Sequence, residues 1–589
     1  MKREFFNTIF WIKYLLLPLL LILFIMATYY IVVDESKVLP REYSVENNTA
    51  LRGSIISKDG YTISSSSKLY KAIIDSRSID KNKLDLFVNL YSIYTNSNKK
   101  AIKKAILSSN GTVVLSNRID PKTATHLKDL ARKLNQKKVF ISFKVGERTN
   151  VPIGMSIVES GEKRSFITND SLTPIIGYMN KIEVMGLTKV KGQKGIERYY
   201  QDYLEASSNG VLKGPRDLAN NIIFQKNSQK SKRIDGYDVI LNIPLSLQIK
   251  IEKMISKAAK LYDADEIVVA ILDSKTARVL SLASSLRYNP NNIKKNEIRL
   301  LNSTSSEYAY EPGSVIKPLI FSILLKEGKI DLNEKIKTYN GVYKLRKRVI
   351  RDTYKEPYLT PSQIISKSSN IGMIMLSSKL DAALLHRGMI EFGLSEKTGI
   401  DLPFEQVGVI PTIDQLDNEV YKATVSYGYG LQTTFIQLLN AYNIFNNDGI
   451  MIAPRIVSYL RRDGDYYIID QPKEKEILTK AQADIVKNIL IETVQEGTAR
   501  AAKNDELEIG GKTGTARIAS KGGYISNYNS SFFGFANDDT NKFTIGVFVN
   551  NPKQGSYYSS QTALPIFNEM IRILLEENYL KPKKDSSKN

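Results

Sequence analysis

The chain has 589 residues, with 83 Lys or Arg against 61 Asp or Glu, so its formal net charge is +22. Apolar residues make up 42% and charged residues 24%, which is typical of folded domains and excludes a disordered polymer. Cysteine is absent, which excludes disulfides, thiolate metal sites and a cysteine nucleophile. Two histidines, His126 and His386, are too few for a histidine-rich metal site. We therefore expect two to four domains, and neither a metal nor a cofactor.

The positive charge has two interpretations. It could attract nucleic acid, anionic lipid or another anionic polymer. It could also come from lysines spread over solvated surfaces. The basic residues do not gather into one stripe and no nucleic-acid-binding motif accompanies them. The second interpretation is therefore preferred, no nucleic-acid partner is expected, and both histidines are expected at the surface.

Residues 14–33 form an uncharged segment of twenty residues, YLLLPLLLILFIMATYYIVV. This length matches one crossing of a hydrocarbon core about 30 Å thick. Basic residues precede the segment and acidic residues follow it: Lys2, Arg3 and Lys13, then Asp34 and Glu35. This charge pattern predicts a cytoplasmic segment at 1–13, a single-pass helix at 14–33 in the cytoplasmic (inner) membrane, and an exported remainder. A cleaved signal peptide is the alternative, but its apolar stretch would be shorter and would end in small residues.

Residues 34–236 are predicted to form an elongated, mixed α+β stalk. The sequence LRGSIISKDGYTIS from Leu51 has short β-like runs on both sides of a turn at 58–60. Lys-rich helical stretches follow, for example near 98–108. No catalytic constellation of His, Asp or Glu appears there, so the stalk is expected to be non-catalytic.

A second domain is predicted at 237–578. Apolar residues at helical spacing lie between 243 and 259, and two β-like runs follow, IVVAILD at 267–273 and RVLSLAS at 278–284. A helix that leads into a hairpin favours a mixed α/β domain. The last helix should begin at Pro565, since proline is favourable in a first turn. Residues 579–589 are expected to form a polar basic tail.

The strongest local motif is YEPGSVIKP at 310–318. Pro312 and Gly313 interrupt any preceding structure, so Ser314 can begin a helix, and Lys317 three residues later lies on the same face. A serine hydroxyl needs a base to take its proton. Lys317 can act as that base if burial and the positive end of a helix lower its pKa.

Single motifs of this kind recur and decide nothing alone. Ser-x-x-Lys also occurs at Ser65/Lys68 and Ser78/Lys81, Ser-Ser-Asn at 108–110 and 207–209, and Lys-Thr-Gly at 397–399. The informative order is Ser314/Lys317, then Ser-Ser-Asn at 368–370, then Lys-Thr-Gly-Thr at 512–515, as in serine penicillin-recognising enzymes. The last motif lies in the strand-like IGGKTGTARI, with glycines where another backbone must approach closely. The copy at 397–399 turns into Ile-Asp-Leu-Pro and is given a structural role.

Together, YEPGSVIKP, SSN and GGKTGTA, with NPN at 289–291, resemble the class B (monofunctional) penicillin-binding proteins. RGSI at 52–55 and GIE at 195–197 are similar to stalk motifs of that family, so the resemblance covers nearly the whole chain. KTGIDLP at 397–403 and SYGYGLQTT at 426–434 resemble the cell-division branch, the FtsI-type transpeptidases; the elongation branch is the alternative. The fold implied is an α/β (α+β) transpeptidase domain whose central antiparallel sheet is flanked by helices, preceded by the stalk and the transmembrane helix.

The resemblance implies a serine-type D,D-transpeptidase that cross-links stem peptides in septal wall synthesis and is covalently inhibited by β-lactams. Ser314 would attack the carbonyl of the penultimate D-alanine and Lys317 would accept its proton. Ser368 would relay a proton to the leaving D-alanine. Asn370 would hold the substrate amide. Hydrolysis of the acyl-enzyme would give a D-Ala-D-Ala carboxypeptidase side activity.

The Lys-Thr-Gly-Thr motif is implied to bind the terminal carboxylate. Lys512 would supply positive potential, and Thr513, Gly514 and Thr515 would contact the carboxylate. The backbone N–H groups of Ser314 and Thr515 would form the oxyanion hole.

The resemblance also implies partners. These are stem peptides ending in D-Ala-D-Ala, a lipid-linked wall precursor or nascent glycan, β-lactams, the membrane, and an FtsW-type multi-spanning glycan polymerase with other divisome proteins. The catalytic domain would be periplasmic or otherwise extracytoplasmic. Residues 37–236 show no glycosyltransferase pattern, so a separate polymerase would be needed.

Several alternatives stay open from the residues alone. Ser368 could cap the helix beginning near Asn370, Thr513 and Thr515 are common strand residues, and Lys512 could be a solvated charge. A serine β-lactamase shares the three motifs but is usually shorter and lacks the stalk. A non-catalytic divisome scaffold and a basic protein that binds anionic wall polymers are the remaining alternatives.

Overall fold

The computed structural model describes residues 2–32, 43–145, 148–150, 154–184, 186–215, 222, 225–226, 228–470, 472–520 and 523–582. The chain divides into two compact units. Unit 1 comprises Met1–Ala50, Lys68–Ser160 and Ser208–Ile234. Unit 2 comprises Leu51–Ser67, Gly161–Ser207 and Asp235–Asn589. Both units are therefore discontinuous in sequence.

Unit 1 begins with α1 (Lys2–Val32), which contains the predicted apolar segment except Val33, a residue outside the described ranges. Large apolar side chains along it are exposed, among them Leu17 and Phe24. Within the described part of the chain, no helix meets the combined requirements of length and apolarity for crossing a membrane. The transmembrane helix at 14–33 therefore stays a prediction.

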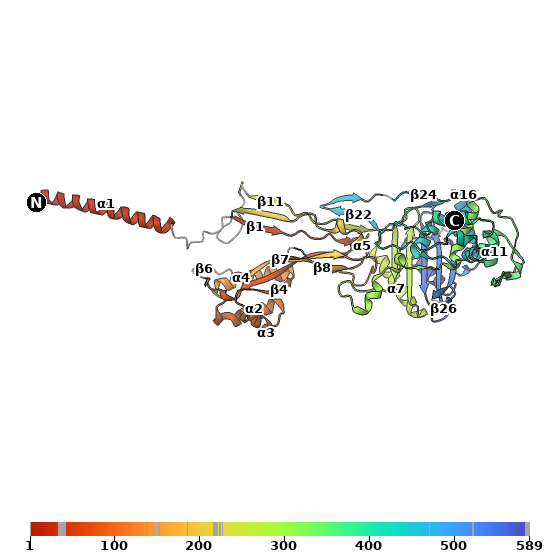
Figure 1. Cartoon of the computed structure of the whole chain (residues 1–589), viewed down its shortest axis with the longest axis horizontal. Helices are drawn as coiled ribbons and strands as arrows, with labels where there is room; N and C mark the ends of the chain where they lie inside the picture. The colour runs from red at the N-terminus through yellow and green to blue at the C-terminus, as the bar shows by residue number, and fades with distance from the viewer. Residues whose placement is uncertain are drawn as a thin grey trace, which may run out of the picture. The chain divides into compact units, whose positions relative to one another are not determined.

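The core of unit 1 lies between three helices and a strand pair. Figure 1 shows α2 (Leu84–Thr95), α3 (Lys99–Leu107) and α4 (Pro121–Gln136) beside β4 (Thr112–Ile119), which pairs antiparallel with β3 (Thr62–Asp75). Their apolar side chains form one buried cluster that includes Phe87 and Leu127. The remaining strands are β1 (Tyr43–Asn48), β5 (Phe143–Val145), β6 (Arg148–Asn150), β10 (Gly210–Pro215) and β11 (Gln229–Ser231).

Unit 2 is built on a five-stranded antiparallel sheet with the strand order β14-β13-β27-β26-β25. The predicted hairpin is confirmed as β13 (Glu266–Asp273) and β14 (Val279–Ser284). The predicted Lys-Thr-Gly-Thr strand is confirmed as β25 (Glu508–Ser520). β26 (Gly523–Asn537) and β27 (Lys542–Asn550) complete the sheet, and β25 is one of its two end strands.

Helices cover both faces of this sheet. Ile267, Val269 and Ile271 pack with α7 (Leu245–Tyr262) and α17 (Ala563–Glu576). Val268 and Ala270 belong to the cluster that contains α9 (Lys317–Lys326) and α15 (Phe435–Asn446). Because successive strand residues point to opposite faces, a strand without polar alternation needs cover on both sides. The predicted last helix is α17, which begins two residues before Pro565.

The RGSI and GIE motifs meet in a buried ion network of unit 2. Glu197, from α5 (Gly195–Tyr199), accepts from Arg52 Nε at 2.9 Å and from Arg164 Nε at 2.7 Å. All three side chains are almost inaccessible. Removing one partner of such a network leaves an unpaired buried charge, which costs several kcal/mol.

The remaining helices and strands of unit 2 are not part of this five-stranded sheet. They are β2 (Ile55–Ile56), β7 (Ser156–Phe166), β8 (Met179–Val184), β9 (Leu187–Gly192), α6 (Gln201–Leu204), β12 (Asp238–Leu241), α8 (Thr304–Glu307), β15 (Ala309–Tyr310), β16 (Ile336–Lys337), β17 (Val342–Leu345), β18 (Arg348–Arg351), β19 (Tyr358–Leu359), α10 (Pro361–Ser366), α11 (Asn370–Ser377), α12 (Ala382–Glu391), α13 (Ile413–Asp417), α14 (Glu419–Ser426), β20 (Thr433–Thr434), β21 (Ile450–Met451), β22 (Val457–Arg462), β23 (Asp465–Ile468), β24 (Lys475–Glu476) and α16 (Lys480–Gln495). β3 and β7 have residues in both units.

Candidate active site

Ser314 lies in a single 3-10 turn rather than in the α-helix that the sequence predicted. The turn is η4 (Gly313–Ile316), and α9 follows it directly, beginning at Lys317. The backbone N–H of Lys317 donates to the carbonyl of Ser314. Residues i and i+3 stack over one another in a 3-10 turn. Among the described residues, however, the amine of Lys317 bonds to Ser368 and Asn370 and not to the hydroxyl of Ser314.

The turn is held in place from the loop before β20. Gly313 adopts φ +61°, a conformation that L side chains rarely adopt. Its N–H donates to the carbonyl of Gly428 at 3.0 Å. Ser314 is left half-buried, and its hydroxyl makes no hydrogen bond to any residue within the described ranges.

The amine of Lys317 is fully buried and points to the Ser-Ser-Asn motif. Its Nζ lies 2.7 Å from the carbonyl oxygen and 3.2 Å from Oγ of Ser368, and 2.8 Å from Oδ1 of Asn370. Burial lowers the pKa of Lys317 to about 7, although the nearby carboxylate of Asp352 raises it. An amine with such a pKa is substantially neutral at neutral pH and can accept a proton.

Ser368 does not cap α11. The cap is Ser369, whose Oγ accepts from the N–H of Gly372 at 2.8 Å. Ser368 itself has φ +58°, a left-handed conformation that costs a non-glycine residue about 1–2 kcal/mol. The alternative that Ser368 caps the helix beginning near Asn370 is therefore wrong. Instead, both the carbonyl oxygen and the hydroxyl of Ser368 contact the amine of Lys317.

Asp352 is a site residue that the sequence analysis missed. It follows β18, and its Oδ1 accepts from the N–H groups of Asn370 at 2.7 Å and Ile371 at 3.3 Å. Oδ2 accepts from the hydroxyl of Ser369. A carboxylate at a helix N-terminus is stabilised by the helix dipole. Asp352 therefore holds the start of α11, and its charge acts on Lys317.

Lys512 is also fully buried and lies close enough to Lys317 for their charges to interact. Its Nζ donates to the carbonyl of Thr513 at 3.1 Å. Burial, and next the positive charge of Lys317, lower the pKa of Lys512 well below its usual value. Two interacting buried amines resist being charged together.

Gly514 lets η4 lie against β25. A Cβ at Gly514 would come within 2.7 Å of Val315 Cγ1 and 2.8 Å of Ser531 Oγ, so a larger residue would force η4 away. The predicted glycine requirement at this strand is confirmed for Gly514, because the approaching chain is η4.

Thr513 and Thr515 are alternate residues and share one face of β25. Thr513 Oγ1 lies 3.0 Å from Oγ1 of Thr498, and Thr515 Oγ1 accepts from the N–H of Ser559 at 3.1 Å. Thr498 is a second residue that the sequence analysis missed. Neither Thr498 nor Asp352 lies in a recognisable motif, so no local signal could have singled them out.

The other motif copies stay outside this cluster. At 397–399, Thr398 donates through its N–H and its hydroxyl to Glu405, in a turn. Ser108 follows the last residue of α3. Within the ranges that the structure describes, no group of three or more His, Asp or Glu side chains could hold a metal ion.

Comparison with protein families matches the penicillin binding protein transpeptidase domain over residues 267–572 and the penicillin-binding protein dimerisation domain over 47–241. The chain belongs to the penicillin-binding protein transpeptidase family. The resemblance to the class B penicillin-binding proteins is confirmed, and the mixed α/β transpeptidase fold with a preceding dimerisation-type stalk fits the same family.

Similar proteins include penicillin-binding transpeptidases from several bacteria. The probable peptidoglycan D,D-transpeptidase PenA of Neisseria meningitidis serogroup A is 30% identical over 393 residues, which cover 66% of this chain and 65% of that protein. The peptidoglycan D,D-transpeptidase FtsI of Buchnera aphidicola is 29% identical over 527 residues, covering 88% of this chain and 81% of that protein. The crystal structure of penicillin binding protein 2X from Streptococcus thermophilus has a TM-score of 0.73 at 18% identity, covering 92% of this chain and 83% of the other. The chain thus spans about two thirds of the length of the PenA relatives.

Proposed function

We propose that the protein is a peptidoglycan D,D-transpeptidase that forms an acyl-enzyme on Ser314. The observation that carries this proposal is the environment of Lys317. Its amine is buried, its pKa is about 7, and it contacts Ser368 and Asn370. Lys317 lies one 3-10 turn after Ser314, whose hydroxyl makes no hydrogen bond to any residue that the structure describes. The family membership and the names of the PenA and FtsI relatives support the same activity.

Acylation would begin with attack of Ser314 Oγ on the carbonyl of the penultimate D-alanine. The neutral amine of Lys317 accepts the hydroxyl proton, since its pKa suits a base at neutral pH. The N–H groups of Ser314 and Thr515 hold the tetrahedral oxyanion; one such donor is worth about 3 kcal/mol in another serine enzyme. Ser368 then passes a proton to the leaving D-alanine, because its Oγ lies 3.2 Å from the Lys317 amine.

Substrate binding would use Asn370 for the peptide amide and the 512–515 motif for the terminal carboxylate. Thr513, Gly514 and Thr515 line the carboxylate, and Lys512 supplies positive potential. A bound carboxylate favours the protonated form of Lys512 and so offsets the effect of burial on its pKa. An amine of a second stem peptide attacks the acyl-enzyme to form the cross-link, and a β-lactam replaces the first substrate.

The cellular setting belongs to the same proposal. The uncharged segment at 14–33, helical up to Val32, supports a single-pass anchor with a cytoplasmic N-terminus and an extracytoplasmic catalytic domain. We propose that the protein acts in septal wall synthesis, together with an FtsW-type polymerase and other divisome proteins. Its wall partner would be a lipid-linked precursor or nascent glycan. The likeness to FtsI over 88% of the chain supports the septal role. Elongation-type synthesis remains the alternative. We also propose that residues 1–13 form a cytoplasmic segment and residues 34–236 the stalk. Residues 237–578 would form the transpeptidase domain, and residues 579–589 a polar tail.

Intact-mass analysis after incubation with benzylpenicillin tests the proposal. We expect one persistent adduct, mapped to Ser314, and none in Ser314→Ala. Rapid turnover of the adduct would instead indicate a β-lactamase. Growth supported by Ser314→Ala in place of the native chain would favour a scaffold. An adduct at another residue, or no adduct in the native chain, would contradict the proposal.

A further inference from the structure

The carbonyl group of Val315 lies in the turn that carries Ser314, directly after the nucleophile. Val315 is completely buried. A 3-10 turn pairs each carbonyl with the backbone N–H of the third residue after it. For Val315 that residue is Pro318, and proline has no N–H. The 3-10 pattern therefore cannot supply a donor to this carbonyl.

Tyr442 of α15 supplies a donor to this carbonyl from a distant part of the chain. Its hydroxyl donates to the carbonyl oxygen of Val315 at 2.7 Å, and its side chain is buried. Burial raises the pKa of Tyr442 well above its usual value. The hydroxyl therefore keeps its proton at neutral pH and remains a donor.

The ring of Tyr442 is held by aromatic contacts with the central sheet and with its own helix. Its centroid lies 5.5 Å from the ring of Phe533 in β26, and 5.7 Å from the ring of Phe445 in a T-shaped arrangement. Such pairs are favourable beyond the area that they bury. Phe533 is the partner of Lys512 in the register of β26 with β25. The position of the Tyr442 hydroxyl is therefore tied to the strands that carry the Lys-Thr-Gly-Thr motif.

η4 is thus fixed on both sides of the nucleophile. Before Ser314, the N–H of Gly313 donates to the carbonyl of Gly428 at 3.0 Å. After Ser314, the carbonyl of Val315 accepts from Tyr442. The N–H of Ser314, proposed above as an oxyanion donor, lies between these two bonds. An oxyanion donor is effective when its direction is set before the reaction begins.

We propose that Tyr442 is a positioning residue for acyl transfer at Ser314. Its hydroxyl fixes the carbonyl of Val315 and so orients both the N–H and the Oγ of Ser314 toward the reacting carbonyl. The proposal rests on the function proposed above and adds a residue to that site. Tyr442 itself touches neither the substrate nor a reacting atom, because it lies in the core.

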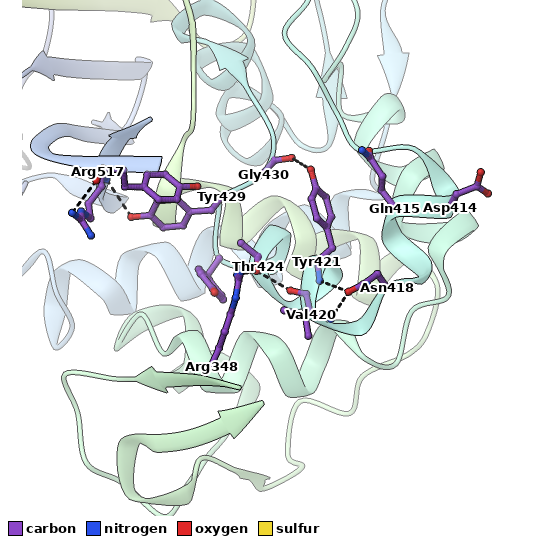
Figure 2. Close-up of a pocket in the computed structure, with 12 residues that line it drawn as sticks. Arg348, Asp414, Gln415, Asn418, Val420, Tyr421, Thr424, Tyr429, Gly430 and Arg517 are labelled. Atoms are coloured by element: carbon purple, nitrogen blue, oxygen red, sulfur yellow. Dashed lines mark hydrogen bonds between the residues drawn. The ribbon is translucent and has the colours of Figure 1, made fainter. Parts of the chain in front are cut away.

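Tyr421 makes the same kind of bond at a more accessible place. Its hydroxyl donates to the carbonyl of Gly430 at 2.9 Å, as Figure 2 shows. Both residues are half-buried and line a cavity of about 870 Å³. Water can replace a lost hydroxyl there. Val315 is completely buried, so its carbonyl would lose the donor outright, and a buried acceptor without its donor is unfavourable.

Tyr442→Phe tests the proposal, because it keeps the ring and removes only the hydroxyl. Stopped-flow acylation by benzylpenicillin gives two quantities, the limiting rate constant at saturation and the Kd of the complex that precedes the covalent bond. We expect the limiting rate constant to fall about tenfold and the Kd to stay within twofold of the native value. The rising limb of the pH profile should not move, since burial and Asp352 set the pKa of Lys317.

Tyr200→Phe is the matched control. Tyr200 is also buried, and its hydroxyl donates to Oδ2 of Asp401 at 3.1 Å. Asp401 keeps its bonds from the N–H groups of Ile456 and Val457 in this variant. Thermal unfolding compares the stability of the two variants, and the control should acylate within twofold of the native rate.

Three results would overturn the inference: a limiting rate constant within twofold of native in Tyr442→Phe, a loss confined to Kd, or an equal loss in Tyr200→Phe. A native chain that forms no penicillin adduct would instead refute the proposed function itself.

Discussion

Lys317 and Lys512 are both fully buried, but their surroundings differ. The amine of Lys317 contacts Ser368 and Asn370 from another segment, whereas the amine of Lys512 donates only to the carbonyl of Thr513 among the described residues. Both pKa values are lowered by burial, and the carboxylate of Asp352 opposes this effect only at Lys317. The total charge of the two amines therefore depends on Asp352, which has no contact with the nucleophile Ser314.

The pH dependence of acylation follows from Lys317. Because the neutral amine is the base, the second-order rate of acylation by penicillin should rise as pH increases through about 7, and level off above it. Asp352→Asn removes the negative charge that raises this pKa, so the rising limb should move to lower pH by about one unit. Stopped-flow acylation across pH 5–9 measures both profiles.

Asparagine keeps an oxygen that can accept from the N–H of Asn370, so α11 should remain anchored in this variant. If the acylation rate of Asp352→Asn rises over the same pH range as that of the native chain, the charge of Asp352 does not affect the pKa of Lys317. A shift to higher pH would contradict the assignment of Lys317 as the base.

At the scale of elements, the site depends on how two short segments are fixed. α11 starts at Asn370 because Ser369 caps it and Asp352 accepts from its first N–H groups. η4 stays against β25 because Gly313 bonds to Gly428. Neither helix is long enough to be stable alone, so these tertiary contacts determine where each begins.

Ser369→Ala tests the cap of α11. Loss of an N-cap serine costs about 1 kcal/mol of stability. Because the first residue of α11 contacts Lys317, acylation should also slow, by roughly tenfold. Denaturant unfolding and penicillin acylation measure the two effects.

Asp381→Ala is the control, since Asp381 caps α12 by accepting from Leu384 at 2.7 Å. It should lose similar stability while its acylation rate stays within twofold of the native rate. Equal rate losses in both variants would mean that stability, not the start of α11, limits the reaction.

Gly428→Ala tests the contact that holds η4. Gly428 has φ +98°, and a Cβ there would lie 2.0 Å from the carbonyl oxygen of Gly313. The added methyl group must displace the Ser314 turn, so penicillin acylation should fall by at least about a hundredfold, equivalent to about 2.7 kcal/mol. Gly464→Ala shares a similar φ of +95° but meets nothing within 4 Å, so it should cost stability only.

At the scale of the whole molecule, unit 2 is assembled from three separate segments. β12 pairs in parallel with β2, joining Val239 to Ile55. The largest buried cluster includes Ile55, Ile196 and Leu204 from the early segments together with Phe435 and Phe533 from the late ones. Residues 51–67 and 161–207, assigned to the stalk from sequence, therefore share a core with the proposed active site.

This shared core predicts that a chain starting at residue 237 will not fold stably. It would lose the partner of β12, the Arg52–Glu197–Arg164 network and part of the main apolar cluster. We expect protease sensitivity, no cooperative thermal transition and no penicillin adduct. A chain starting at residue 43 keeps all described elements except α1 and should form the adduct at the native rate. A stable, penicillin-binding 237–582 fragment would contradict the prediction.

The amino-acid sequence by itself determined the features that depend on local chemistry. The hairpin of β13 and β14 and the strand at 508–520 follow from residue order, because side-chain periodicity and turn residues act over a few positions. The order of three motifs was enough to recognise the family.

Only the tertiary structure decided how distant segments meet. It placed Asp352 at the start of α11, split the expected helix at Ser314 into η4 and α9, and joined early segments to the late core. These outcomes depend on packing between residues far apart in the chain, for which local patterns carry no signal.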